Sequence, residues 1–179
     1  MCGACGTPAT GWTERIAPLG AGAAQRRARA LCALVRATAA PGARLATVLP
    51  WPGGGLRLGG PGGWRFAPSL LTAARDLTRR HGPLVPIHSP VAASATEVAL
   101  PFELTPDALV TWCAAVVAAD PPDDSPVIVT GAGREITLTH RHAHIADGPA
   151  TAPTIRTRHP TAPLAEHWRS VLHPFRAGH

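Results

Sequence analysis

The spacing of apolar and polar residues along the chain predicts four helices. In residues 23–39, apolar side chains recur every three or four positions, and four arginines fall mostly on the other side. Pro41 and Gly42 follow, and neither residue continues a helix. The predicted helices are 23–39, 70–80, 107–119 and 164–172. The third begins most clearly, with Thr105 as N-cap and Pro106 in the first position.

Short apolar or alternating segments between the helices predict strands. The predicted strands are 44–51, 56–58, 64–67, 96–104, 127–130 and 134–140. The last two flank Gly131-Ala132-Gly133, which predicts a hairpin. Pro101 restricts the strand over residues 96–104 to a sheet edge, because proline donates no backbone hydrogen bond. Gly and Pro punctuate residues 1–21, and no helix or strand is predicted there. Residues 151–163 are rich in Pro and Thr and are predicted to be irregular.

Two halves of the chain repeat one order of elements. Residues 31–48 align without a gap on residues 112–129, at a shift of 81, and six of the 18 pairs are identical. Each half reads as helix, two or three strands, helix, which predicts a tandem duplication, with alanine-rich coincidence as the alternative. The expected fold class is α+β, with helices on one face of an antiparallel sheet. A unit of this size is marginal alone, so the halves are expected to share a core.

This pattern divides the chain into four parts. They are an N-terminal CxxC segment (1–22), a basic repeat unit (23–83), a connector with an edge strand (84–104) and a second repeat unit (105–179). The tryptophans are expected in the core or at the seam between units, since each combines a large apolar area with an N–H that needs a partner. These residues are Trp12, Trp51, Trp64, Trp112 and Trp168.

Charge distinguishes the two halves more sharply than their pattern does. Residues 23–83 hold ten arginines and one acidic residue, a formal charge of +9, whereas residues 84–179 hold six arginines and nine acids, a charge of −3. The basic half therefore suggests an anionic partner, and attraction between the halves is the alternative. All 17 basic residues are arginine, which indicates the GC-rich genome of a bacterium or phage rather than a function.

Eight arginines form the candidate anion-binding surface. They are Arg26, Arg29, Arg36, Arg57, Arg65, Arg75, Arg79 and Arg80. Guanidinium groups suit phosphate, so nucleic acid is the expected partner and an acidic protein surface the alternative. Helix, three strands, helix is also the order of the double-stranded-RNA-binding domain, but that family's Lys-rich helix start is absent. The aromatic pattern of RNP-type single-strand binders is not found either.

Cysteine and histidine motifs suggest a metal site. Cys2 and Cys5 form a CxxC with glycine after each cysteine, which is half of a tetrahedral zinc or iron site. His140, His142 and His144 would project from one face of a strand. These five residues are the candidate ligands, and zinc is the candidate cofactor. The alternatives are a redox dithiol, a functionally silent tail and an exposed histidine-rich hairpin end.

These patterns combine into one functional hypothesis. The chain is expected to be a non-enzymatic binding protein that engages nucleic acid through its basic half. One alternative is a structural or assembly subunit that docks to a larger complex, and another is a metal-dependent enzyme using the histidine cluster. No transmembrane or signal-peptide pattern is visible, so a cytoplasmic protein without membrane partners is expected, with self-association left open.

Overall fold

The computed structural model describes most of the chain. Described are residues 11–39, 44–52, 55–87, 96–99, 103–121, 124–131, 133–140, 142–148, 153–159 and 161–176. The helices are α1 (Trp12–Ile16), α2 (Ala23–Thr38), α3 (Leu70–His81), α4 (Pro106–Ala118) and α5 (Thr161–Leu172), followed by the 3-10 turn η1 (His173–Phe175). The strands are β1 (Thr47–Pro50), β2 (Leu56–Gly60), β3 (Gly63–Ala67), β4 (Thr96–Ala99), β5 (Val127–Gly131), β6 (Arg134–Leu138), β7 (Ala143–Asp147) and β8 (Thr154–Thr157).

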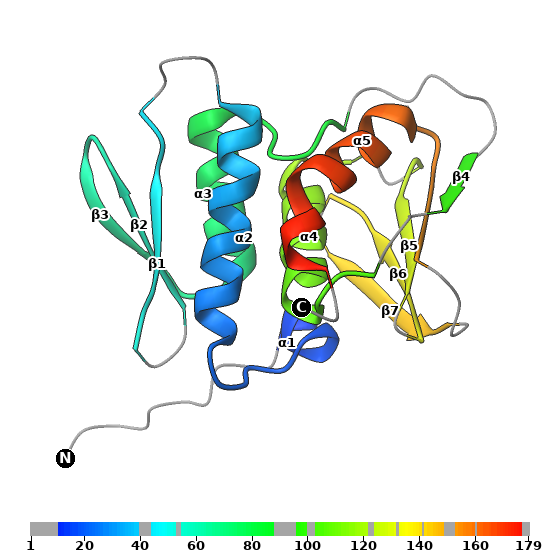
Figure 1. The fold of residues 1–179 in the computed structure, drawn as a ribbon, viewed down its shortest axis with the longest axis horizontal. Coiled ribbons are helices and arrows are strands. Elements are labelled where there is room, and N and C mark those ends of the chain that lie inside the picture. The colour runs from blue at the N-terminus through cyan, green and yellow to red at the C-terminus, as the bar shows by residue number, and fades with distance from the viewer. Residues whose placement is uncertain are drawn as a thin grey trace.

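Four layers stack across the molecule (Figure 1). A three-stranded antiparallel sheet of order β1-β2-β3 packs on α2 and α3. These two helices contact α4, which lies beside α5, and the second antiparallel sheet, of order β4-β8-β5-β6-β7, closes the other side. The α+β class, with helices on one face of each antiparallel sheet, is therefore confirmed.

One hydrophobic core runs through both halves. Alternation along the strands directs Val48, Leu56 and Leu58 of the first sheet, and residues such as Val129 and Ile136 of the second, toward the helices. Helix α4 is buried on nearly all sides because it lies between the other helices and the second sheet. The expectation of a shared core is confirmed.

The element order repeats as the sequence suggested. The series α2-β1-β2-β3-α3 matches α4-β5-β6-β7-α5, with β8 inserted before α5 and β4 added at the sheet edge. An ion pair joins Arg26 to Asp107, two positions 81 residues apart. The tandem duplication itself stays a prediction, because a shared order of elements does not establish common descent.

The helix boundaries follow local chemistry. Ser69 caps α3, since its hydroxyl accepts a hydrogen bond from the Thr72 backbone N–H at 3.1 Å. Thr105 stands at the N-cap of α4 as predicted, but its side chain makes no capping hydrogen bond. Its backbone N–H instead donates to the Phe175 carbonyl, which ties α4 to the C-terminal turn η1.

The prediction that residues 151–163 are irregular was wrong in part. Strand β8 forms there and pairs with both β4 and β5. Helix α1 forms within residues 1–21, where no element was predicted. Strand β7 completes a three-stranded meander with β5 and β6, which the sequence had suggested only as a hairpin. In the described part of the chain, no helix has both the length and the apolar character needed to cross a membrane.

The free energy of unfolding is expected to depend on pH because of His167 in α5. Burial lowers the pKa of its imidazole to about 4, and the Leu84 backbone partly opposes this shift. The unfolded chain, with a histidine pKa near 6.5, therefore binds the proton first. We expect the free energy of unfolding to be constant above about pH 6.5 and to fall by up to roughly 3 kcal/mol as the pH drops to about 4. Chemical denaturation at several pH values measures this slope.

His167→Leu provides the test of this assignment. The variant should lose most of the decline between pH 6.5 and pH 4, because leucine binds no proton. His144→Gln, a change at an exposed histidine, is the control and should keep the decline. An identical slope in His167→Leu and the parent protein would show that another group causes it.

Candidate functional site

The outer face of the three-stranded sheet exposes large apolar side chains. The strand register places Leu49, Arg57 and Phe66 in one row and Thr47, Gly59 and Trp64 in the next. Side chains that alternate with the buried ones point away from the helices. Trp51, Trp64 and Phe66 are 41%, 50% and 54% exposed. We call the group formed by Leu49, Trp51, Arg57, Trp64 and Phe66 the aromatic face.

Arg57 lies at the centre of the aromatic face. Its guanidinium carbon is 5.1 Å from the ring centroid of Trp51 and 4.7 Å from that of Trp64. Trp51 and Phe66 meet edge to face, with ring centroids 5.7 Å apart. Cation–π and edge-to-face contacts each favour a defined ring orientation. The rings are therefore ordered before any partner arrives, yet about half of each remains open to solvent.

Glycines open a hollow beside Trp64. A Cβ atom on Gly59 would lie 3.0 Å from the Trp64 ring, so the absence of a side chain at residue 59 lets the indole lie close to the strand. The hollow has a volume of about 340 Å³ and is lined by Thr47, Gly59, Gly60 and Trp64, with Arg44 also contributing. The tight turn from β2 to β3 ends at Gly63, whose φ of 91° suits glycine.

The structure separates the eight predicted arginines into three groups. Arg26 pairs with Asp107 at 2.6 Å, and Arg79 and Arg80 both pair with Asp76. Arg29, Arg36, Arg65 and Arg75 are exposed and form no ion pair with another described residue, and Arg57 contacts the tryptophans. The sequence analysis missed Arg44, which is exposed at the hollow. The sequence offered one indication, because Arg44 lies in the basic half just before the segment that forms β1.

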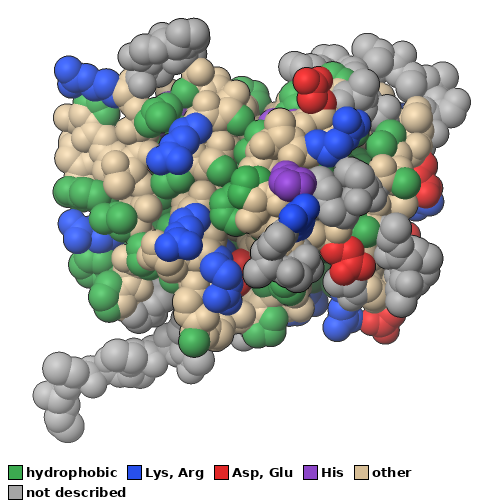
Figure 2. Space-filling model, viewed as in Figure 1, with side chains coloured by type: hydrophobic (Ala, Val, Ile, Leu, Met, Phe, Trp, Pro, Cys, Tyr) green, Lys and Arg blue, Asp and Glu red, His purple; other side chains and the backbone are tan. Residues whose placement is uncertain are grey.

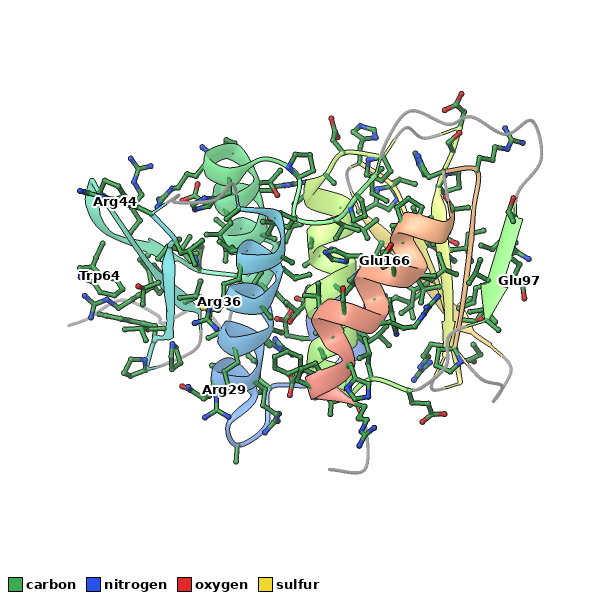
Figure 3. The ribbon with its side chains drawn as sticks, turned by 45° about the horizontal axis from the view of Figure 1, so that its top comes forward. Arg29, Arg36, Arg44, Trp64, Glu97 and Glu166 are labelled. Atoms are coloured by element: carbon green, nitrogen blue, oxygen red, sulfur yellow. The ribbon has the colours of Figure 1, made fainter. Side chains whose placement is uncertain are left out.

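The charge asymmetry of the sequence persists on the molecular surface. Figure 2 shows Arg side chains spread over the half that contains α2 and the three-stranded sheet, with the acids mainly on the other half. In Figure 3, Arg29 and Arg36 lie along α2, and Arg44 and Trp64 lie at the three-stranded sheet. Glu97 and Glu166 lie in the other half. Asp76 is the one acid in residues 23–83, and α3 holds it away from the aromatic face.

The expected place of two tryptophans was wrong. Trp112 and Trp168 are buried in the core as predicted, and Trp12 is partly buried against it. Trp51 and Trp64 are exposed instead, because α2 and α3 pack on the opposite face of the sheet. The sequence did contain a signal, since Trp64 and Phe66 stand two residues apart and therefore share one face of a strand. Although no RNP motif is present, the sheet does display aromatic rings on one face.

The outer face of the second sheet has a different chemistry. Its threonines Thr130 and Thr154 share a hydrogen bond, and Arg156 pairs with Glu135 at 3.7 Å. Glu97 stands opposite Arg156 in the register of β4 and β8. On that face Arg156 thus has carboxylates beside it, in contrast to Arg57 of the first sheet. Among the described residues, large exposed aromatic rings beside an arginine without an ion pair are found on the first sheet.

The candidate metal ligands do not form a group in the described part of the chain. Cys2 and Cys5 lie outside the described residues. His140 follows β6, whereas His142 and His144 are exposed at and within β7. Among the residues that the structure describes, no cluster of three or more His, Cys, Asp or Glu could hold a metal. Zinc binding therefore stays a prediction.

The aromatic face presents aromatic, aliphatic and guanidinium groups to the solvent. Its five residues include no nucleophile, carboxylate or imidazole. Cys113 is buried in α4, and this burial raises the pKa of its thiol, which keeps it protonated. No family model, curated protein or solved structure matches the chain.

Proposed function

We propose that this protein binds nucleic acid on the arginine-rich surface of its first half. One observation carries the proposal: Arg29, Arg36, Arg44, Arg65 and Arg75 are exposed and form no ion pair with a described residue. Uncompensated guanidinium groups attract a phosphate backbone and release its counterions on binding. The proposed activity is therefore binding rather than catalysis.

The arrangement of ion pairs argues against mutual attraction of the halves as the role of these arginines. Arg26 and Arg27 join α2 to α4 through Asp107. The other ion pairs of the basic half do not involve the acidic half. Asp76 pairs with Arg79 and Arg80 within α3. Glu14 of α1 pairs with Arg27. Five of the ten arginines of this half are exposed without an ion pair to a described residue, and these can meet a partner outside the chain.

Helix α2 supplies a row of positive charge along this surface. Arg29 and Arg36 are seven residues apart, so two helical turns, or about 10 Å, separate them on one exposed stripe. Both point to solvent on the half that bears the three-stranded sheet (Figure 3). A polyanion crossing this side of the molecule would meet both guanidinium groups.

The double substitution Arg29→Glu plus Arg36→Glu tests the proposal. We expect weaker binding of a fluorescein-labelled 20-nucleotide strand, and a slope of log K against log salt that is shallower by about 1.4, since each lost phosphate contact removes about 0.7. Fluorescence anisotropy at several salt concentrations measures both quantities.

Arg158→Glu plus Arg169→Glu is the matched control. It makes the same change in net charge at two exposed arginines of the acidic half. Binding should fall less in this variant, and its salt slope should match that of the parent protein. Equal losses in the two double variants would mean that net charge alone, rather than the proposed surface, governs binding.

A further inference from the structure

We infer that the aromatic face is a stacking site for unpaired nucleic-acid bases, so that the bound polymer is single-stranded. This inference rests on the proposed function and deepens it. The arginines of α2 can attract any polyanion, whereas exposed rings recognise the flat faces of bases. In a duplex those faces are hidden in the stack, so only a single strand presents them to a protein.

The geometry of the rings supports stacking. Trp51, Trp64 and Phe66 lie within one sheet face, and 41%, 50% and 54% of their surfaces are open. The guanidinium carbon of Arg57 lies over both indoles, within 5.1 Å of each centroid, which favours a defined ring orientation while about half of each indole stays open. A base that stacks on an ordered ring loses less binding energy to ordering than it would on a mobile one. Stacking needs no particular base, so little sequence preference is expected.

The hollow next to Trp64 lets a strand approach the sheet backbone. Gly59 and Gly60 have no side chains, and about 340 Å³ of space lies between them, Thr47 and Trp64. Arg44 stands at the same hollow and is exposed. A base can thus stack on Trp64 while the guanidinium of Arg44 contacts its phosphate, a pairing typical of single-strand binders.

Charge favours this occupant over a second copy of the chain. A two-fold dimer through the aromatic face would bring Arg57 near its own equivalent, and no carboxylate on this face compensates the charge. A polyanion with flat apolar groups can pair with the arginines and stack on the rings. An apolar protein surface could contact only the rings.

The test compares leucine and phenylalanine at the two tryptophans. Trp51→Leu plus Trp64→Leu keeps an apolar surface but removes stacking, and we expect its affinity for a 20-nucleotide single strand to fall at least about tenfold. Trp51→Phe plus Trp64→Phe keeps aromatic rings and should stay within about threefold of the parent protein. Because both tryptophans are exposed, we expect each variant to fold like the parent protein. Its melting temperature checks this expectation.

Tryptophan fluorescence adds a readout that does not depend on affinity. Stacked bases should quench the exposed Trp51 and Trp64, whereas Trp112 and Trp168 are shielded in the core. The phenylalanine variant should therefore bind the strand with little quenching. Quenching that persists in full in that variant would place the bases elsewhere and overturn the inference.

The outcomes separate this inference from the proposed function. Equal affinity for single strand and duplex, with no loss in the leucine variant, would overturn base stacking and leave phosphate binding intact. Absence of binding to either form in low salt would overturn both. A dimer in sedimentation that dissociates in the leucine variant, without single-strand binding, would instead assign the aromatic face to self-association.

Discussion

Replacing Asp107 with alanine is expected to lower the free energy of unfolding by about 3–5 kcal/mol. Asp107 is buried at the start of α4 and pairs with Arg27 at 2.9 Å and Arg26 at 2.6 Å. Arg27 is itself buried, so the substitution leaves a guanidinium group in the interior without its main partner. Glu14, at 3.6 Å from Arg27, compensates only in part.

This cluster also determines how the two halves of the chain are joined. It links the first turns of α2 and α4, and Arg27 additionally donates a hydrogen bond to the Ala17 carbonyl after α1. An acidic side chain near the start of α4 further interacts favourably with the helix dipole. Loss of Asp107 should therefore weaken the contact between three helices at once.

Urea denaturation followed by circular dichroism measures the effect. Arg26→Ala is the control, because its side chain is 48% exposed and Asp107 keeps Arg27 as a partner. We expect this variant to lose less than about 1 kcal/mol. If Asp107→Ala were no less stable than Arg26→Ala, the buried ion pair would not contribute to stability as proposed.

Replacing Trp168 with alanine is the second substitution with a large expected effect. Trp168 of α5 and Trp112 of α4 are both fully buried and meet edge to face, with ring centroids 4.9 Å apart. Truncation to alanine creates a cavity between these helices, and buried tryptophan losses of this kind cost about 3–5 kcal/mol. Thermal unfolding of the variant beside the parent protein measures the loss.

Trp168→Phe provides an informative comparison for the same position. The indole N–H of Trp168 is buried without a hydrogen-bond partner in the described structure, and phenylalanine removes that unsatisfied group. We expect this variant to lose clearly less stability than the alanine variant, since most of the ring volume remains. Equal losses would show that the indole nitrogen has a partner or that the ring shape itself is essential.

The elements with a strong local pattern could be predicted from the sequence. Helix α2 was expected over residues 23–39 and spans Ala23–Thr38, because its apolar stripe and the proline that follows define it. The hairpin of β5 and β6 was recognised from the glycine turn between two β-branched segments. The α+β class followed from the order of these elements.

Strand β8 could not be predicted because its pairing is not local. It lies between β4 and β5, which are far from it in the sequence, and its four residues contain no long apolar run. Strand β7 similarly contains His144 and Asp147 and depends on its pairing with β6. Pairing with other strands determines both β7 and β8, and only for β8 did composition favour irregular structure.

Of the candidate site, only its positive charge could be predicted from the sequence. Counting residues identified the basic half. It could not show that Asp76 pairs with Arg79 and Arg80, or that Arg29 and Arg36 form no ion pair with a described residue. Large tryptophans ordinarily indicate a core, so Trp51 and Trp64 were placed there. Their exposure depends on which face of the sheet the helices cover, and that is decided by the whole fold.

The most direct measurement is the affinity of the unmodified chain for a labelled 20-nucleotide single strand and for its duplex, at 50 and 200 mM salt. Single-strand binding through about four phosphate contacts should weaken about 50-fold between these concentrations and should exceed duplex binding at both. The absence of saturable single-strand binding at 50 mM salt would contradict the proposal that this protein binds nucleic acid.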